Sequence, residues 1–279
     1  DSGGSDRRRP GGRDQDRRIS VRRSSARRRQ GGSARSRPLI DMSDTSVQGA
    51  TQRAAAMPHA VVVVGSAGGV GTSVISALLA EYRAATTLGA ASWWVDASGN
   101  DCDIELRLQG RGDPSLLRSE LGTGLHLAAE GASVVDTVEE VWGNGAVPVV
   151  DAGARLLTSL ADLTGDVLVD KVTPVIVLGV RPDLLNRARP FLSEWHKAGV
   201  LERSVVVINN PVPLPNQASL RTLLIDTVGA NVAAVVGFDY EPVLGSGLAM
   251  GRVAQEKFLP ATWVSLQALA QATHGPAAQ

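Results

Sequence analysis

The sequence predicts an α/β fold in which a mainly parallel sheet is covered by helices on both faces. From His59 onward, short β-branched runs alternate with amphipathic helical patterns, which is typical of strand–helix–strand units. Most of these runs are apolar throughout, as expected of strands buried on both sides. The chain has 279 residues, enough for one large domain with a substantial core.

Six strands and four helices can be placed from the sequence. The strands are expected at Ala60–Val64, Ser92–Val95, Val147–Val150, Pro174–Val180, Ser204–Ile208 and Ala233–Phe238. Apolar residues recur at helical spacing within residues 74–82, 184–195, 220–228 and 261–272. Pro190 is expected to kink or restart the second helix. The last helix carries an apolar stripe that we expect to pack on the sheet rather than on a membrane. Residues 98–146 show no clear pattern.

The first 57 residues differ in composition from the rest of the chain. Residues 1–58 hold 14 of the 28 basic residues, all of them Arg, but only six of the 28 acids. With few aliphatic residues and no aromatic ones, residues 1–57 are expected to form a disordered arm. Residues 58–279 are expected to form the folded domain. Arg clusters in the arm suit DNA or an anionic surface, although a solubilising tail is the alternative.

Several classes of site are disfavoured by the composition. Cys102 is the only cysteine, so a disulfide framework is excluded. The four histidines are far apart without metal-ligand spacing. Asp101, Asp103 and Glu105 are expected to lie in a solvated loop. Glycines interrupt the uncharged stretch after Arg53, so no transmembrane segment is expected, and we predict a cytoplasmic protein.

The most informative segment is a glycine-rich turn between the first strand and the first helix. It reads Val61-Val-Val-Val-Gly-Ser-Ala-Gly-Gly-Val-Gly-Thr-Ser73. Glycines allow positive φ and close approach of a phosphate to the backbone. The following helix offers free N–H groups and a positive dipole end. The turn therefore predicts an anion site, although a tight turn without ligand has the same pattern.

Residues 67–73, Ala-Gly-Gly-Val-Gly-Thr-Ser, resemble the deviant Walker A loop of the MinD/ParA ATPase family, Lys-Gly-Gly-x-Gly-Lys-Ser/Thr. The resemblance implies a Rossmann-like P-loop fold with a ligand crevice at the carboxyl ends of the strands. It also implies a set of phosphate-binding residues, namely Gly68, Gly69, Gly71, Thr72 and Ser73. Ser73 stands where the family binds magnesium.

Later segments resemble other motifs of this family, over about residues 59–255. Asp96 ends a strand that resembles the family's second strand, and Asp151 ends one that resembles its Walker B strand. The resemblance implies that Asp96 and Asp151 hold magnesium together with Ser73. Asn209 stands at the position that contacts adenine, and Asp239 lies in a segment that resembles the loop beside the base.

The sequence departs from the family at the residues that carry charge. Ala67 replaces the signature lysine, Thr72 the P-loop lysine, and Ser98 the second acid of the second strand. Phosphoryl transfer depends on charge stabilisation, so hydrolysis is expected to be absent or very weak. We predict a degenerate pseudo-ATPase adaptor in bacterial partitioning, septum placement or secretion. The resemblance implies ATP or ADP with magnesium as cofactor, if any binds, a homodimer, and a protein partner that is not specified.

A nicotinamide-dependent oxidoreductase is the main alternative. Gly65-x-x-x-Gly69-x-Gly71 also fits a dinucleotide loop, and Asp96 could accept ribose hydroxyls. The catalytic Tyr-x-x-x-Lys pair of short-chain dehydrogenases is missing, because neither Tyr82 nor Tyr240 is followed by lysine four residues later. A second alternative is a nucleic-acid-associated module that acts through the Arg-rich arm, with binding that falls steeply with salt.

Overall fold

We describe the fold from a computed structural model, in which the described residues are 59–99, 104–109, 118–165, 169–213, 215–247 and 250–274. The Arg-rich arm predicted for residues 1–57 lies outside this range. So do Asp101 and Asp103 of the predicted solvated loop, and the side chain of Glu105.

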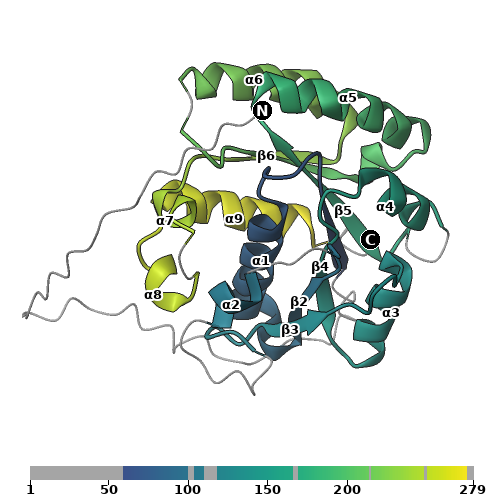
Figure 1. Cartoon of the computed structure of the whole chain (residues 1–279), viewed down its shortest axis with the longest axis vertical. Coiled ribbons are helices and arrows are strands. Elements are labelled where there is room, and N and C mark those ends of the chain that lie inside the picture. Colours follow the sequence, from purple (N-terminus) through teal and green to yellow (C-terminus); the bar gives the residue numbers. More distant parts are fainter. Residues whose placement is uncertain are drawn as a thin grey trace, which may run out of the picture. The chain divides into compact units, whose positions relative to one another are not determined.

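The centre of the fold is a sheet of seven strands in the order β3-β2-β4-β1-β5-β6-β7, with every neighbouring pair parallel (Figure 1). The strands are β1 Ala60–Gly65, β2 Ser92–Asp96, β3 Gly124–Leu127, β4 Val147–Asp151, β5 Val172–Gly179, β6 Val205–Asn209 and β7 Ala234–Phe238. Because all strands are parallel, their carboxyl ends and the loops that follow them share one edge of the sheet. The predicted α/β fold is confirmed.

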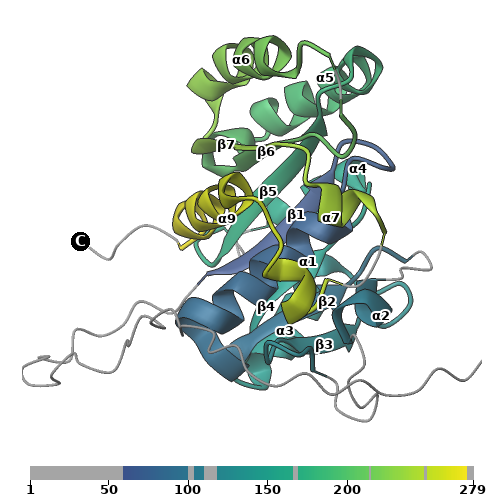
Figure 2. The ribbon, with the colours of Figure 1, turned by 90° about the vertical axis from the view of Figure 1, so that its left-hand side faces the viewer.

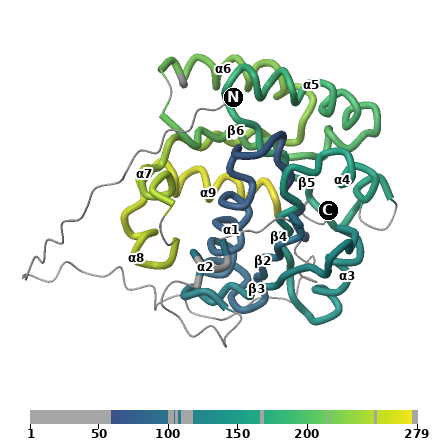
Figure 3. The backbone as a smooth tube through the Cα atoms, in the orientation of Figure 1, coloured from purple at the N-terminus to yellow at the C-terminus, as the bar shows by residue number. Residues whose placement is uncertain are grey.

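Helices cover both faces of the sheet, as the successive views show (Figures 2 and 3). The helices are α1 Thr72–Arg83, α2 Ile104–Gln109, α3 Val134–Gly143, α4 Leu156–Leu163, α5 Pro182–Lys197, α6 Gln217–Val228, α7 Pro242–Gly245, α8 Arg252–Gln255 and α9 Pro260–Ala272. Residues of α1, α2 and α9 share one hydrophobic core, and residues of α3, α4, α5 and α6 share the other.

Strand β1 lies in the middle of the sheet and contributes to both cores. Val61 and Val63 belong to the core under α1, whereas Val62 and Val64 belong to the opposite core, and all four are completely buried. This alternation follows from the two-residue period of a strand. Each face needs an apolar side chain, which explains why the run contains no polar residue.

The structure differs from the sequence-based prediction in α5 and in β3. Helix α5 runs from Pro182 to Lys197 without restarting at Pro190. Its buried side supports this continuity: Trp195 is completely buried and donates from Nε1 to the Leu156 carbonyl at 3.0 Å. Tertiary packing thus offsets the hydrogen bond that proline removes. Strand β3, only four residues long, lies within residues 98–146 together with α2 and α3, and the sequence predicts none of these three elements.

The last helix, α9, packs against α1 and β7, as predicted from its apolar stripe. Leu266 and Leu269 are buried, whereas Trp263 stays partly exposed beside Tyr82. The buried Arg83 of α1 donates to the carbonyl of Thr273, at 2.8 Å, just after α9 ends. A cation there complements the negative end of the helix dipole. Within the described residues, none of the helices combines the length and apolar character needed to span a bilayer.

Candidate functional site

The glycine-rich turn forms an open loop between β1 and α1. Gly69 and Gly71 adopt positive φ, +79° and +91°, which residues with a side chain rarely do. Gly68 and Gly69 are exposed, and a methyl group built on either would meet no atom within 4 Å. Gly71 precedes α1 without any side-chain cap, and no acid lies in the first turn. The backbone donors at this end of α1 are therefore available to an anion.

Hydrogen bonds to the neighbouring strands hold this loop in place. The N–H of Gly65 donates to the Gly153 carbonyl at 2.7 Å, and the N–H of Ser66 donates to Val177 at 2.9 Å. The Nδ2 of Asn209, at the end of β6, donates to the Val70 carbonyl at 2.8 Å. Asn209 also leaves no room for a side chain at position 71. The loop is thus fixed in its open shape by β5, by β6 and by the turn that follows β4.

The loop carries no cation of its own. The side chain of Thr72, at the P-loop lysine position, is buried and folds back over Gly65. Only its backbone N–H can face a ligand above the loop. Ala67, at the signature lysine position, is half-buried. The charge that lysines would bring to a phosphate is therefore missing from the loop itself.

Two carboxylates lie side by side next to the loop. Asp96 and Asp151 are the last residues of β2 and β4 and are register partners on these neighbouring strands. Both are buried, and Asp151 is completely so. One oxygen of each accepts from the backbone two residues later, Ser98 for Asp96 and Gly153 for Asp151, both at 2.9 Å. The second oxygen of Asp151 has no hydrogen-bond partner among the described residues.

The charge of Asp151 is costly in this environment. Burial raises its pKa from 3.8 to about 6, and the negative charge of Asp96 adds to the rise. The Ser73 hydroxyl and the Gly153 N–H lower the pKa again, but by less. A buried acid with a free oxygen, beside a second acid and a serine hydroxyl, suits a hard cation such as magnesium. Among the described residues there is no group of three or more acidic, His or Cys side chains placed for a metal, so water and phosphate would complete its coordination.

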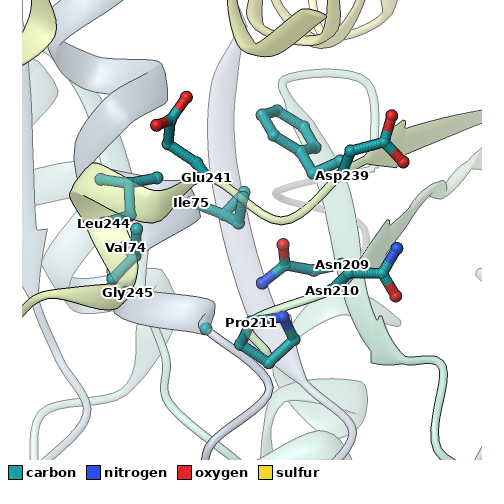
Figure 4. Close-up of a pocket in the computed structure, with 11 residues that line it drawn as sticks. Val74, Ile75, Asn209, Asn210, Pro211, Asp239, Glu241, Leu244 and Gly245 are labelled. Atoms are coloured by element: carbon teal, nitrogen blue, oxygen red, sulfur yellow. The ribbon is translucent and has the colours of Figure 1, made fainter. Parts of the chain in front are cut away.

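A pocket lies beside the glycine loop, between α1, the end of β6 and the loop before α7 (Figure 4). Asn209 and Asn210 extend from the same strand end, and the Asn209 amide points towards α1. Asn210 is 1% exposed, and neither its amide oxygen nor its amide nitrogen has a hydrogen-bond partner among the described residues. Buried amides are normally paired, so the Asn210 amide can donate to and accept from a ligand in this pocket.

Two acids line this pocket but are engaged elsewhere. The Asp239 carboxylate forms an ion pair with Arg221 at 2.6 Å and points away from the pocket (Figure 4). Glu241 is buried and accepts from the backbone of Val243 and Leu259 and from the Thr262 hydroxyl. It thereby ties the starts of α7 and α9 together. The cavity measures about 70 Å³, below the roughly 300 Å³ or more of typical ligand pockets.

Solved structures with the same fold include a ParA family ATPase and the cell division protein MinD. A ParA family ATPase from Chlorobium tepidum TLS is 17% identical, with a TM-score of 0.51 over 77% of this chain and 99% of its own. MinD from Aquifex aeolicus is 19% identical, with a TM-score of 0.51 over 79% of this chain and 98% of its own. The fold is that of the ParA and MinD ATPases. A MinC:MinD complex from Aquifex aeolicus matches equally well, at 18% identity and a TM-score of 0.52 over 79% of this chain and 98% of that one.

This likeness lies in the fold and not in an overall sequence match. No protein-family model matches the chain, and no curated protein matches its sequence. The oxidoreductase alternative predicts the dinucleotide-binding order 3-2-1-4-5-6, in which β1 pairs with β2. Here β4 lies between β2 and β1, so the sheet does not have that order.

Most of the predicted site residues lie at one edge of this ParA/MinD-like sheet. Ser73, Asp96 and Asp151 lie close together, and Asn209 contacts the loop directly. The roles assigned to these residues, and to Gly68, Gly69, Gly71, Thr72 and Asp239, remain predictions. Asn210, a second amide before a proline, is a pocket residue that was not predicted from the sequence. Arg155, four residues after Asp151, was not predicted to lie near the site either.

Proposed function

We propose that this chain is a degenerate member of the ParA/MinD type that binds ATP or ADP, with magnesium, and does not turn it over at an appreciable rate. It acts as an adaptor, in bacterial partitioning, septum placement or secretion, and it works in the cytoplasm. The change between the empty and the nucleotide-bound form is what a protein partner recognises. The MinC:MinD complex supports the idea of such a partner.

One observation carries the nucleotide proposal: buried polar atoms without partners surround an open glycine loop. They are the Ser66 hydroxyl, one oxygen of Asp151 and the whole amide of Asn210. Leaving such groups unpaired costs roughly 1–3 kcal/mol each. Phosphate on the loop, magnesium at Asp151 and a base near Asn210 would satisfy all three.

The lack of hydrolysis follows from the missing charges. Phosphoryl transfer gains its rate from cations and positioned donors around the transferred group. The loop offers backbone N–H groups in place of the two lysines, and Ser98 replaces an acid. These donors suffice for binding but stabilise the transition state no more than the ground state. The cavity proposed for the nucleotide base is small, so the loop before α7 must move outward to admit a base. This movement predicts a modest affinity for ATP and ADP.

Isothermal titration of the full chain tests this proposal. ATP and ADP are expected to bind, more tightly with magnesium than without it, whereas NADH is expected to give no heat. Binding of NADH without binding of ATP would favour the oxidoreductase alternative. Absence of any heat with ATP, together with an unchanged melting temperature, would show that the crevice does not bind nucleotide.

Gly69→Ala is expected to weaken ATP binding about tenfold, the loss of one charge-assisted backbone contact. Alanine at φ +79° is strained by about 1–2 kcal/mol, and its methyl group occupies the space into which a phosphate would enter. Gly145→Ala is the matched control, because Gly145 has a φ of +74°, is equally open, and precedes β4 away from the loop. Both variants should lose similar stability in urea. Equal losses of ATP affinity would argue that strain, and not the phosphate contact, is responsible.

A further inference from the structure

We infer that Arg155 supplies the cation that the glycine loop lacks, by contacting the phosphoryl oxygens of the bound nucleotide. This inference rests on the proposed function and adds to it a residue that has no counterpart in the loop motif. It starts from the electrostatic problem of the site. Two buried carboxylates and a polyphosphate would otherwise meet there with only magnesium and backbone donors to offset their charge.

Arg155 is held next to the loop by its backbone. It follows β4 and is the N-cap residue of α4. The intervening segment is tied to β1 twice: the N–H of Ala152 donates to Val63 at 2.9 Å, and the carbonyl of Gly153 accepts from Gly65 at 2.7 Å. Two residues span at most about 7 Å, so the Cα of Arg155 lies near the start of the loop.

The guanidinium group of Arg155 is free. The side chain is exposed and lies over Gly99 so closely that a Cβ at Gly99 would be 2.0 Å from Nη2. Asp96 and Glu130 line the same open pocket, of about 470 Å³. Yet within the described residues Arg155 forms no ion pair and no side-chain hydrogen bond. Its five N–H donors therefore have no acceptor among the residues that the structure describes.

Other arginines at the same edge of the sheet are paired. Arg181, which follows β5, forms an ion pair with Asp183 at 2.9 Å. Arg221 pairs with Asp239, which follows β7. Among these three, Arg155 alone keeps its donors available in the described part of the chain, and it lines the same pocket as Asp96 of the candidate magnesium site. A guanidinium group matches phosphate oxygens in a two-pronged geometry, which makes an anionic phosphate its natural partner.

The position of Gly99 supports a role for the arginine as it is placed. Gly99 has a φ of +67°, which favours glycine, and its lack of a side chain leaves the space that the guanidinium group occupies. The loop after β2 thus leaves a space that Arg155 fills, with Asp96 at its border. The backbone of Arg155 follows β4, which ends in Asp151, and its guanidinium group lies over the loop after β2, which ends in Asp96. A phosphate that spans these two strand ends would come within its reach.

The test compares Arg155→Ala, Arg155→Lys and the control Arg187→Ala in the full chain. Arg187 is an exposed arginine on α5 for which the structure shows no partner among the described residues. Titrations use ATP and inorganic tripolyphosphate. Arg155→Ala should weaken both about tenfold, the worth of one charge-assisted contact. Arg155→Lys should recover part of the loss, Arg187→Ala should bind as wild type, and all three should melt like wild type. Any binding of the ligands by the Arg-rich arm is the same in all variants, so it does not affect their affinities relative to wild type.

Equal affinity of Arg155→Ala and wild type for both ligands would overturn this inference while leaving the proposed function standing. Loss of tripolyphosphate binding in Arg155→Ala, in a chain that shows no preference for ATP over tripolyphosphate, would support the inference but count against a nucleotide function. Failure of the wild-type chain to bind either ligand would overturn both. A drop of affinity in Arg187→Ala as large as in Arg155→Ala would also overturn the inference, because it would reduce Arg155 to general surface charge.

Discussion

Restoring both lysines, as Ala67→Lys with Thr72→Lys, is expected to raise the affinity for ATP about a hundredfold. Each lysine adds a charge-assisted contact to phosphate, worth roughly 1.5–3 kcal/mol. Thr72 now folds back over Gly65, but a lysine is too long for that space and would extend above the loop. Isothermal titration with ATP and magnesium measures the gain. Hydrolysis should remain slow, because Ser98 still replaces an acid.

The control adds the same two charges elsewhere. Ala85 and Thr86 are exposed residues of the same types and follow α1 at its far end. Ala85→Lys with Thr86→Lys should leave the ATP affinity within about twofold of wild type, because exposed charges beyond roughly 10 Å are screened. If the two double variants gained equally, the benefit would come from net charge, and the loop would not be a phosphate site.

Asp151→Asn is expected to stabilise the ligand-free protein by about 2–3 kcal/mol at pH 8. Asp151 has its pKa raised to about 6 in the folded state, against 3.8 for the ordinary value. Above pH 6 the folded protein must therefore hold a charge that the unfolded chain carries without cost. Asparagine removes that charge, can still accept from Gly153, and can donate to Ser73. Urea unfolding at pH 8 measures the gain.

The pH dependence of this gain follows from the direction of the shift. Between pH 3.8 and 6 the unfolded chain releases the proton more readily than the folded protein, so the penalty grows with pH. The advantage of Asp151→Asn should therefore vanish below about pH 4. Glu139→Gln, an exposed neutralisation on α3, should change stability little at either pH. A destabilised Asp151→Asn at pH 8 would mean that the carboxylate is satisfied in the folded protein and does not await a cation.

The double-lysine variant and Asp151→Asn both address a site whose charged groups favour ligand binding but lower the stability of the ligand-free protein. Asp151 is held charged in a buried position, and a cation bound there would offset the cost. Such strain is common where function needs a group that folding alone would not favour. Magnesium should accordingly stabilise the wild-type protein in the presence of ATP, and it should lose this effect in Asp151→Asn.

The sheet was largely predictable because its strands are apolar on both faces. The run at β1 and the first four residues of β6 are all β-branched or small, and they have no plausible place outside a core. Strand β3 could not be predicted in the same way. It has only four residues, and Gly124 is there because the Trp93 ring of β2 packs where its side chain would be. That requirement comes from a neighbouring strand and leaves no local pattern.

The candidate site was predictable in its backbone but not in its side-chain partners. Glycines at positions 69 and 71 predict a backbone with positive φ. Acids at the carboxyl ends of the parallel strands β2 and β4 are expected at the same edge of the sheet. The inward turn of Thr72 depends on the space over Gly65. Whether the guanidinium group of Arg155 has an ion-pair partner depends on which acidic side chains the fold brings close to it. Neither can be read from spacing along the chain, because both are set by tertiary contacts.

Equilibrium dialysis of radiolabelled ATP against the full chain with magnesium, followed by chromatography of the label, examines binding and hydrolysis together. If the loop binds the ATP phosphates without lysines and without hydrolysis, the protein side should hold excess label. That label should be recovered as ATP even after long incubation. Equal label on both sides would show that the protein does not bind ATP. Continuing turnover, with bound label recovered mostly as ADP, would show that it hydrolyses ATP, and either result would contradict the account.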